Sequence, residues 1–168
     1  FEAADVNNDG SINVLDVVGT VNIIMNPIGG GSITPGEINY VPTEPVGEAD
    51  IFWREDTLFV DSPIPLAGLQ LSFDYDLDYD LLDAVKGFEH MSYMQENEKI
   101  LMLYSLSGKK LSTGITPILV KHHTAEVAIT KAVLSNMEGR MVTANYMGYR
   151  LKDINAKAQS SSIFTAAA

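Results

Sequence analysis

Hydrophobic and polar residues alternate along the chain from residue 49 onward, in short runs divided by turn-forming residues. In one run, Leu69, Leu71 and Phe73 are each separated by a polar residue, which is the period of a strand with one buried face. We predict strands at Ala49–Trp53, Thr57–Asp61, Ala67–Asp74, Leu82–Val85, Phe88–Tyr93, Ile100–Ser105, Pro117–His122, Ala125–Thr130 and Arg140–Asn145. Turn signals recur about every eight to twelve residues, a spacing typical of all-β folds. The pattern therefore predicts a mainly β protein, a β-sandwich of about nine strands.

The first 27 residues have a helical pattern instead. Apolar side chains occupy most positions of the run Val14–Met25 and leave only a narrow polar stripe. A surface helix usually carries an apolar stripe of about 100°, so we expect this helix to be covered on more than one side. The rest of the chain, a missing preceding repeat or a neighbouring subunit could supply the cover. Pro27 and the glycines at 29–31 are expected to end the helix.

A Gly- and Pro-rich stretch at residues 28–48 predicts a mainly extended linker between these two parts. Within it, Ile38–Val41 is also compatible with an edge strand. We therefore divide the chain into a loop and helix at 1–27, the linker at 28–48, a β-sandwich at 49–155, and a polar, small-residue tail at 156–168.

Residues 5–16 carry oxygen-bearing side chains at loop positions 1, 3, 5, 9 and 12, with Gly10 at the position of a sharp turn. Calcium takes about six to eight oxygen ligands, and this spacing directs oxygens toward one centre. A backbone carbonyl normally serves at position 7, and Ile12 is expected to tie the loop to a hydrophobic core. The predicted Ca²⁺ ligands are Asp5, Asn7, Asp9, Ser11, Asn13 and Asp16. The alternative interpretation is an Asn-, Asp- and Gly-rich surface turn.

The loop differs from an EF-hand, because Asp16 replaces the bidentate Glu and too few residues precede the loop to form an entering helix. A loop that runs directly into one helix resembles a dockerin repeat, the calcium-binding half-module of cellulosome-type assemblies. The matching residues are Asp5, Asn7, Asp9, Gly10, Ile12 and Asp16, followed by the apolar run. A dockerin has two such repeats, whereas one is visible here. The resemblance implies structural calcium and attachment to a protein partner, not calcium sensing.

The second part resembles a cohesin-like domain over roughly residues 47–150. The resemblance is carried by Pro65–Asp74, by the segment from Leu103 to Gly114, and by the later apolar runs at 118–120, 127–129 and 132–136, in the same order as in that family. It implies a cohesin-like jelly-roll β-sandwich, which is a non-catalytic binding module that usually recognises a dockerin.

Composition excludes several classes of function. The net charge of −11 argues against nucleic acid as a partner, because phosphate contacts need Lys and Arg. With no cysteine, the chain has no disulfide, thiolate metal site or cysteine nucleophile. No apolar run reaches the roughly 18–20 residues that span a membrane. Phe1 in place of Met indicates a mature form or a fragment. These features fit a secreted, extracellular or cell-surface protein.

The remaining candidate chemistry does not favour an enzyme. The acidic run Asp74–Asp80 fits a solvated face, a second calcium site or paired glycosidase carboxylates. His122 and His123 are adjacent, so in a strand they point to opposite faces and do not predict a zinc site. The sequence has neither a Gly-x-Ser-x-Gly elbow nor a P-loop.

Two functions remain open from the sequence. The first is a calcium-binding assembly or adhesion protein, in which the dockerin-like segment contacts a cohesin-like sandwich in its own chain or in a copy, head to tail, giving a polymer or filament. The second is a carbohydrate-binding accessory module of a secreted polysaccharide-degrading system. In that case Tyr75 with Tyr79, and Tyr146 with Tyr149, would supply aromatic platforms.

Overall fold

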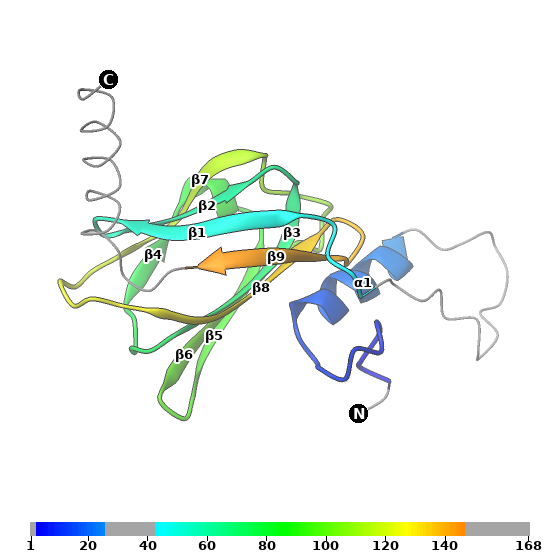
Figure 1. Ribbon diagram of the computed structural model, residues 1–168, viewed down its shortest axis with the longest axis horizontal. Helices are drawn as coiled ribbons and strands as arrows, with labels where there is room; N and C mark the ends of the chain where they lie inside the picture. The colour runs from blue at the N-terminus through cyan, green and yellow to red at the C-terminus, as the bar shows by residue number, and fades with distance from the viewer. Residues whose placement is uncertain (1–2, 26–42, 147–168) are drawn as a thin grey trace, which may run out of the picture.

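The computed structural model describes residues 3–25 and 43–146. Within these ranges, one α-helix precedes nine strands and a short 3-10 helix (Figure 1). The elements are α1 (Val14–Met25), β1 (Glu48–Arg54), β2 (Thr57–Ser62), β3 (Leu66–Phe73), β4 (Tyr79–Leu81), η1 (Asp83–Val85), β5 (Glu89–Gln95), β6 (Glu98–Tyr104), β7 (Gly114–Lys121), β8 (Ile129–Asn136) and β9 (Met141–Tyr146). The predicted helix begins at Val14 as expected, and the mainly β fold of about nine strands is confirmed.

The strands form one sheet in the order β4-β7-β2-β1-β9-β8-β3-β6-β5, which curls so that its two halves face each other (Figure 1). Every neighbouring pair is antiparallel except β1 and β9, which run parallel. The first and last strands of the sandwich therefore lie side by side, and β9 joins the two halves.

The core lies between the two halves of the sheet. Leu69, Leu71 and Phe73 are fully buried, as their alternation predicts. From the opposite half, Trp53 packs on Phe73 with ring centroids 6.2 Å apart. The outer face of β3 is buried as well, because α1 covers it, so β3 shows little alternation in exposure.

Two of the predicted strands are wrong. Leu82–Val85 contains η1, in which the Val85 N–H donates to the Leu82 carbonyl at 3.1 Å. The helical turn buries Val85, which is packed in the main core. The strand in this region comes earlier, at β4, and its pairing with β7 is extended by the bond from Leu82 N–H to the Ile118 carbonyl.

The prediction of a strand at Ala125–Thr130 also fails, since β8 begins only at Ile129. Of the residues before it, Ala128 keeps one backbone bond beside β3, because its carbonyl accepts the Asp74 N–H at 3.1 Å, and the other bonds of this segment go to side chains. Asp74 accepts the Ala128 N–H at 2.8 Å, and the Ala125 carbonyl accepts a bond from Lys121. The apolar residue of this alternating pattern is nevertheless in the core, because Val127 is fully buried although its segment is irregular.

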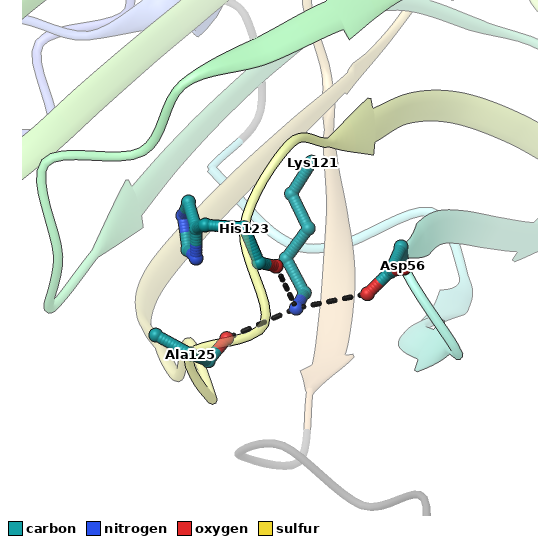
Figure 2. Close-up of polar contacts among 4 residues, drawn as sticks. All are labelled: Asp56, Lys121, His123 and Ala125. Carbon is teal, nitrogen blue, oxygen red and sulfur yellow. Dashed lines mark hydrogen bonds and ion pairs between the residues drawn. The ribbon is translucent and has the colours of Figure 1, made fainter.

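Lys121 fixes this irregular segment from inside the fold (Figure 2). Its ammonium donates to the carbonyls of His123 and Ala125, both at 2.9 Å, and pairs with an Asp56 carboxylate oxygen at 3.1 Å. Its side chain is fully buried and its Nζ lies 6.0 Å from the centre of the Trp53 ring. A buried cation with three acceptors and an aromatic face is well compensated. Lys121 therefore holds the β7–β8 connection against the β1–β2 turn.

Several predictions lie outside the described residues, namely most of the linker at 28–48, the strand Ile38–Val41, Tyr149 and the tail at 156–168. The described part of the chain contains no helix long and apolar enough to cross a membrane.

Candidate functional site

The loop at residues 5–12 is held by bonds from its own backbone to its side-chain oxygens. Asp5 accepts the N–H groups of Asp9 at 3.1 Å and Gly10 at 2.9 Å, one on each carboxylate oxygen. Asp9 in turn accepts the Ser11 N–H at 2.8 Å. Gly10 has φ of 84°, a conformation that favours glycine, at the position where the spacing predicts a sharp turn.

Asn13 and Asp16 cap the start of α1. The Asn13 side chain accepts the Leu15 N–H at 2.8 Å, and Asp16 returns by accepting the Asn13 N–H at 2.8 Å. This reciprocal arrangement is a capping box with Asp in the place of Glu. The second Asp16 oxygen accepts the Val6 N–H at 2.8 Å and ties the start of the loop to the helix. Both side chains are buried, so each has a structural role in the fold.

Four of the six predicted calcium ligands lie around one pocket of about 300 Å³, shared with β8 and β9. These four are Asn7, Asp9, Ser11 and Asn13, and Lys131 of β8 also lines the pocket. Asp5 and Asp16 do not line it. Within residues 3–25 and 43–146, no three His, Cys, Asp or Glu side chains gather as a group that could hold a metal. Calcium binding by the loop stays a prediction.

The prediction that Ile12 ties the loop to a core is wrong, because 49% of its surface is exposed. Val14, Leu15 and Val18 make that connection instead. The capping box sets this outcome, since it starts the helix at Val14 and leaves Ile12 in the turn before it.

Helix α1 packs on the outer face of β3, β6 and β8 (Figure 1). Val14 and Val18 are buried there with Ala67, in a small apolar cluster distinct from the main core. Partly buried side chains of the two flanking strands and of the β8–β9 turn complete this cluster: Met102, Tyr104, Val133 and Met137. One polar bond sets the helix position, from Val14 N–H to the Gln70 side-chain oxygen at 3.1 Å. We call this surface of β3, β6 and β8 the docking face.

Two glycines let the helix approach the sheet closely. A Cβ atom on Gly68 would lie 2.7 Å from Cγ2 of Val18 and 2.8 Å from Cγ2 of Val14. A Cβ atom on Gly139, in the β8–β9 turn, would lie 2.8 Å from the Cα of Gly19. The backbone of α1 therefore lies directly against the β8–β9 turn, and the side chains of Val14 and Val18 lie directly against the backbone of β3. A glycine inside a strand is a known sign of close backbone approach, and Gly68 in the predicted strand Ala67–Asp74 was the available signal for this face.

The sequence predicts a helix covered on more than one side, and the structure agrees for its first half. The docking face lies under Val18, and the β8–β9 turn lies against Gly19. The last turn differs, because Ile23, Ile24 and Met25 are exposed.

The acidic run Asp74–Asp80 has its carboxylates exposed to solvent, as one of its interpretations predicts. Asp76 pairs with Lys99 at 3.0 Å and Asp80 with His122 at 2.9 Å. The two adjacent histidines have different neighbours, since the His123 ring lies 4.6 Å from the ring of Tyr75.

The described tyrosines differ in exposure. Tyr79 and Tyr146 are partly buried and pack against the main core, and the Tyr146 hydroxyl donates to the Thr130 carbonyl at 3.1 Å. Tyr75 is exposed. Tyr75 and Tyr79 therefore do not form a flat exposed platform, whereas Tyr149, the predicted partner of Tyr146, lies outside the described residues.

No protein-family model and no curated protein matches this sequence. Among solved structures, the chain is similar to a non-cellulosomal cohesin from Archaeoglobus fulgidus, with 9% identity and a TM-score of 0.45 over 59% of this chain and 84% of that one. A cohesin–dockerin complex from Clostridium thermocellum matches with 8% identity and a TM-score of 0.45, over 64% and 94% of the two chains. The seventh type I cohesin of ScaB from Pseudobacteroides cellulosolvens matches with 10% identity and a TM-score of 0.45, over 62% and 90%.

Proposed function

We propose that this chain is a non-catalytic, extracellular attachment module, in which a calcium-stabilised loop and helix dock on the outer face of a β-sandwich. The contact forms within one chain and, by exchange, between copies, which joins them head to tail. The observation that carries the proposal is the glycine-lined contact of α1 with the docking face, because Gly68 and Gly139 leave room for this helix and for little else.

The docking contact has the properties of an exchangeable interface. It buries a small apolar cluster, separate from the main core, and adds one polar bond through Gln70. The sandwich core is built without α1, so the helix can leave its own face while the strands stay folded. Residues 26–42 connect α1 to the rest of the chain, and a stretch of that length spans at most about 60 Å. A connection of this length allows α1 to reach the docking face of an adjacent copy.

The loop suits calcium through its donor chemistry. Its candidate ligands all offer oxygen, which is the ligand that hard cations such as Ca²⁺ prefer. A carboxylate has about four lone-pair sites, so Asp5 and Asp16 can accept their backbone N–H bonds and still contribute to an ion. Bound calcium would fix the loop that leads into the capping box, and so hold the helix in the conformation that docks.

Replacing Asp9 with alanine is expected to abolish calcium binding, because it removes a carboxylate that lines the pocket beside the loop. Isothermal titration of the whole chain with CaCl₂ measures the effect. Asp83→Ala is the matched control, since it removes an exposed carboxylate outside both the loop and the acidic run Asp74–Asp80. If Asp9→Ala binds calcium as the native chain does, the loop is a surface turn and the calcium part of the proposal is wrong.

Exchange between copies is expected to appear when two complementary variants are mixed. Gly68→Leu blocks the docking face but keeps the helix, whereas Val18→Asp disables the buried side of the helix but keeps the face. An immobilised Gly68→Leu chain should retain Val18→Asp in CaCl₂, and should retain much less of a second Gly68→Leu chain. Equal retention of both would contradict exchange through this face.

A further inference from the structure

Strand β5 is an open edge of the sheet. It pairs with β6 along its whole length, and no described residue pairs with its other side. All seven of its residues are exposed, including the large apolar side chains of Met91, Tyr93 and Met94, at 49%, 41% and 44%. A row of unpaired backbone N–H and C=O groups runs along this edge, where a further strand can add.

The edge lacks the features that normally prevent such pairing. Soluble proteins shield edge strands with short length, Lys or Pro residues, or β-bulges. β5 contains no Lys, Arg or Pro, and its register with β6 is continuous. The opposite edge, β4, is only three residues long and carries Asp80. The two edges of the same sheet are thus built differently, and only β5 is suited to pairing.

The sequence of β5 is complementary to itself in the antiparallel direction. A two-fold axis through Ser92 places Met91 opposite Tyr93 of a second strand, and His90 opposite Met94. Glu89, the only acidic residue of the strand, then lies opposite Gln95 and not opposite another carboxylate. A methionine beside an aromatic ring is a favourable cross-strand pair. The symmetric pairing therefore contains no like-charge contact.

We propose that two copies of this chain pair through β5, edge to edge about Ser92, so that the two sheets become continuous. Because Met91 lies opposite Met102 of β6, and Tyr93 opposite Ile100, both side chains lie on the same side of the sheet as the docking face. The two Met91–Tyr93 pairs extend the apolar surface of one copy to that of the other. The contact is isologous, closes at two copies, and uses no residue of the calcium loop.

The charge of the chain sets how this contact depends on salt. Each copy has a net charge of −11, so two copies repel each other at long range, while the paired strands carry almost no charge. Screening weakens the repulsion, and the Debye length falls from about 30 Å at 0.01 M to about 10 Å at 0.1 M salt. The dimer fraction is therefore expected to rise as NaCl is added.

Single-cysteine variants test the geometry directly, since the native chain has no cysteine. Two copies of Ser92→Cys place their sulfurs at the axis, where directly opposed Cβ atoms are about 4.5–5.5 Å apart. In the Gln95→Cys variant, the two introduced residues lie about 20 Å apart along the paired strands. With oxidised glutathione, Ser92→Cys should form a disulfide-linked dimer far more completely than Gln95→Cys. Equal cross-linking of the two variants would overturn the proposal.

Sedimentation across a concentration series tests the contact in the native chain. The native protein should form a reversible dimer in CaCl₂ and equally in EGTA, and Tyr93→Lys should be a monomer. Ile115→Lys, at an exposed apolar position on β7, is the matched control and should dimerise as the native chain does. A native chain that is monomeric at every concentration would contradict the pairing. Association that EGTA abolishes would instead belong to exchange of α1, so the two proposals fail separately.

Discussion

Replacing Lys121 with methionine is expected to lower the free energy of unfolding by about 3 kcal/mol. The substitution keeps most of the side-chain volume but removes the ammonium, so the carbonyls of His123 and Ala125 lose their donor inside the fold. Loss of one member of a buried pair costs about 3–5 kcal/mol. Because Asp56 is exposed and stays hydrated when Lys121 is lost, we expect a cost at the low end of this range. Denaturation by urea, followed by fluorescence of Trp53, measures the change.

Lys99→Met is the matched control for this prediction. Lys99 pairs with the exposed carboxylate of Asp76, and such a pair contributes about 0–1 kcal/mol. If the two variants are equally stable, the bonds of Lys121 contribute no more than an ordinary surface pair, and the β7–β8 connection is held by the burial of Val127 and the bonds of Asp74 to Ala128.

Gly68→Leu is expected to detach α1 from the docking face and to lower the unfolding free energy by about 2–3 kcal/mol. Its Cβ alone would overlap Cγ2 of Val18 and of Val14, at 2.7 and 2.8 Å, and a valine in a helix strongly prefers one rotamer, so neither side chain moves away easily. Forcing extra atoms into a packed contact typically costs about 1–3 kcal/mol. Hydrogen exchange resolved by mass spectrometry should show fast exchange in α1 and unchanged protection in β3, because the main core does not include the helix.

Gly19→Ala tests whether any substitution of a glycine at this interface has the same effect. A Cβ atom there would lie 3.7 Å from Cγ1 of Val6, an ordinary contact. Alanine is favoured over glycine in a helix by about 1 kcal/mol, so this variant is expected to be more stable than the native chain. If α1 loses its protection from exchange in both variants, any glycine substitution at this interface detaches the helix, and the close approach at Gly68 is not the cause.

The sequence predicts strands well where alternation and burial coincide. Leu69, Leu71 and Phe73 face the core through a regular strand, so periodicity finds them. Val127 is as deeply buried but comes from a segment held by side-chain bonds, and periodicity alone does not distinguish the two cases. The same limit explains the wrong prediction of a strand at Leu82–Val85, where a 3-10 turn buries Val85.

The candidate site was predictable in its local part only. The spacing of oxygens in residues 5–16 and the helix that follows depend on neighbours in sequence, and both are read directly. The surface that the helix packs on cannot be predicted in this way, because the bond between Val14 and Gln70 joins residues far apart in the chain. Asn13 and Asp16 show a further limit, since a carboxylate or amide at a ligand position can equally well be a helix cap.

The parallel pairing of β1 with β9 determines how the sandwich would respond to mechanical tension. The chain enters β1 at Glu48 and leaves β9 at Tyr146, and the register runs from Glu48 opposite Thr143 to Ile51 opposite Tyr146. A pull on the two ends drags these strands in opposite directions along their length. The bonds between them, together with the flanking bond from Thr143 N–H to the Gly47 carbonyl, then share the force in shear and do not open one after another. Tension applied at Glu48 and Tyr146 would therefore be resisted first by this parallel pair of strands.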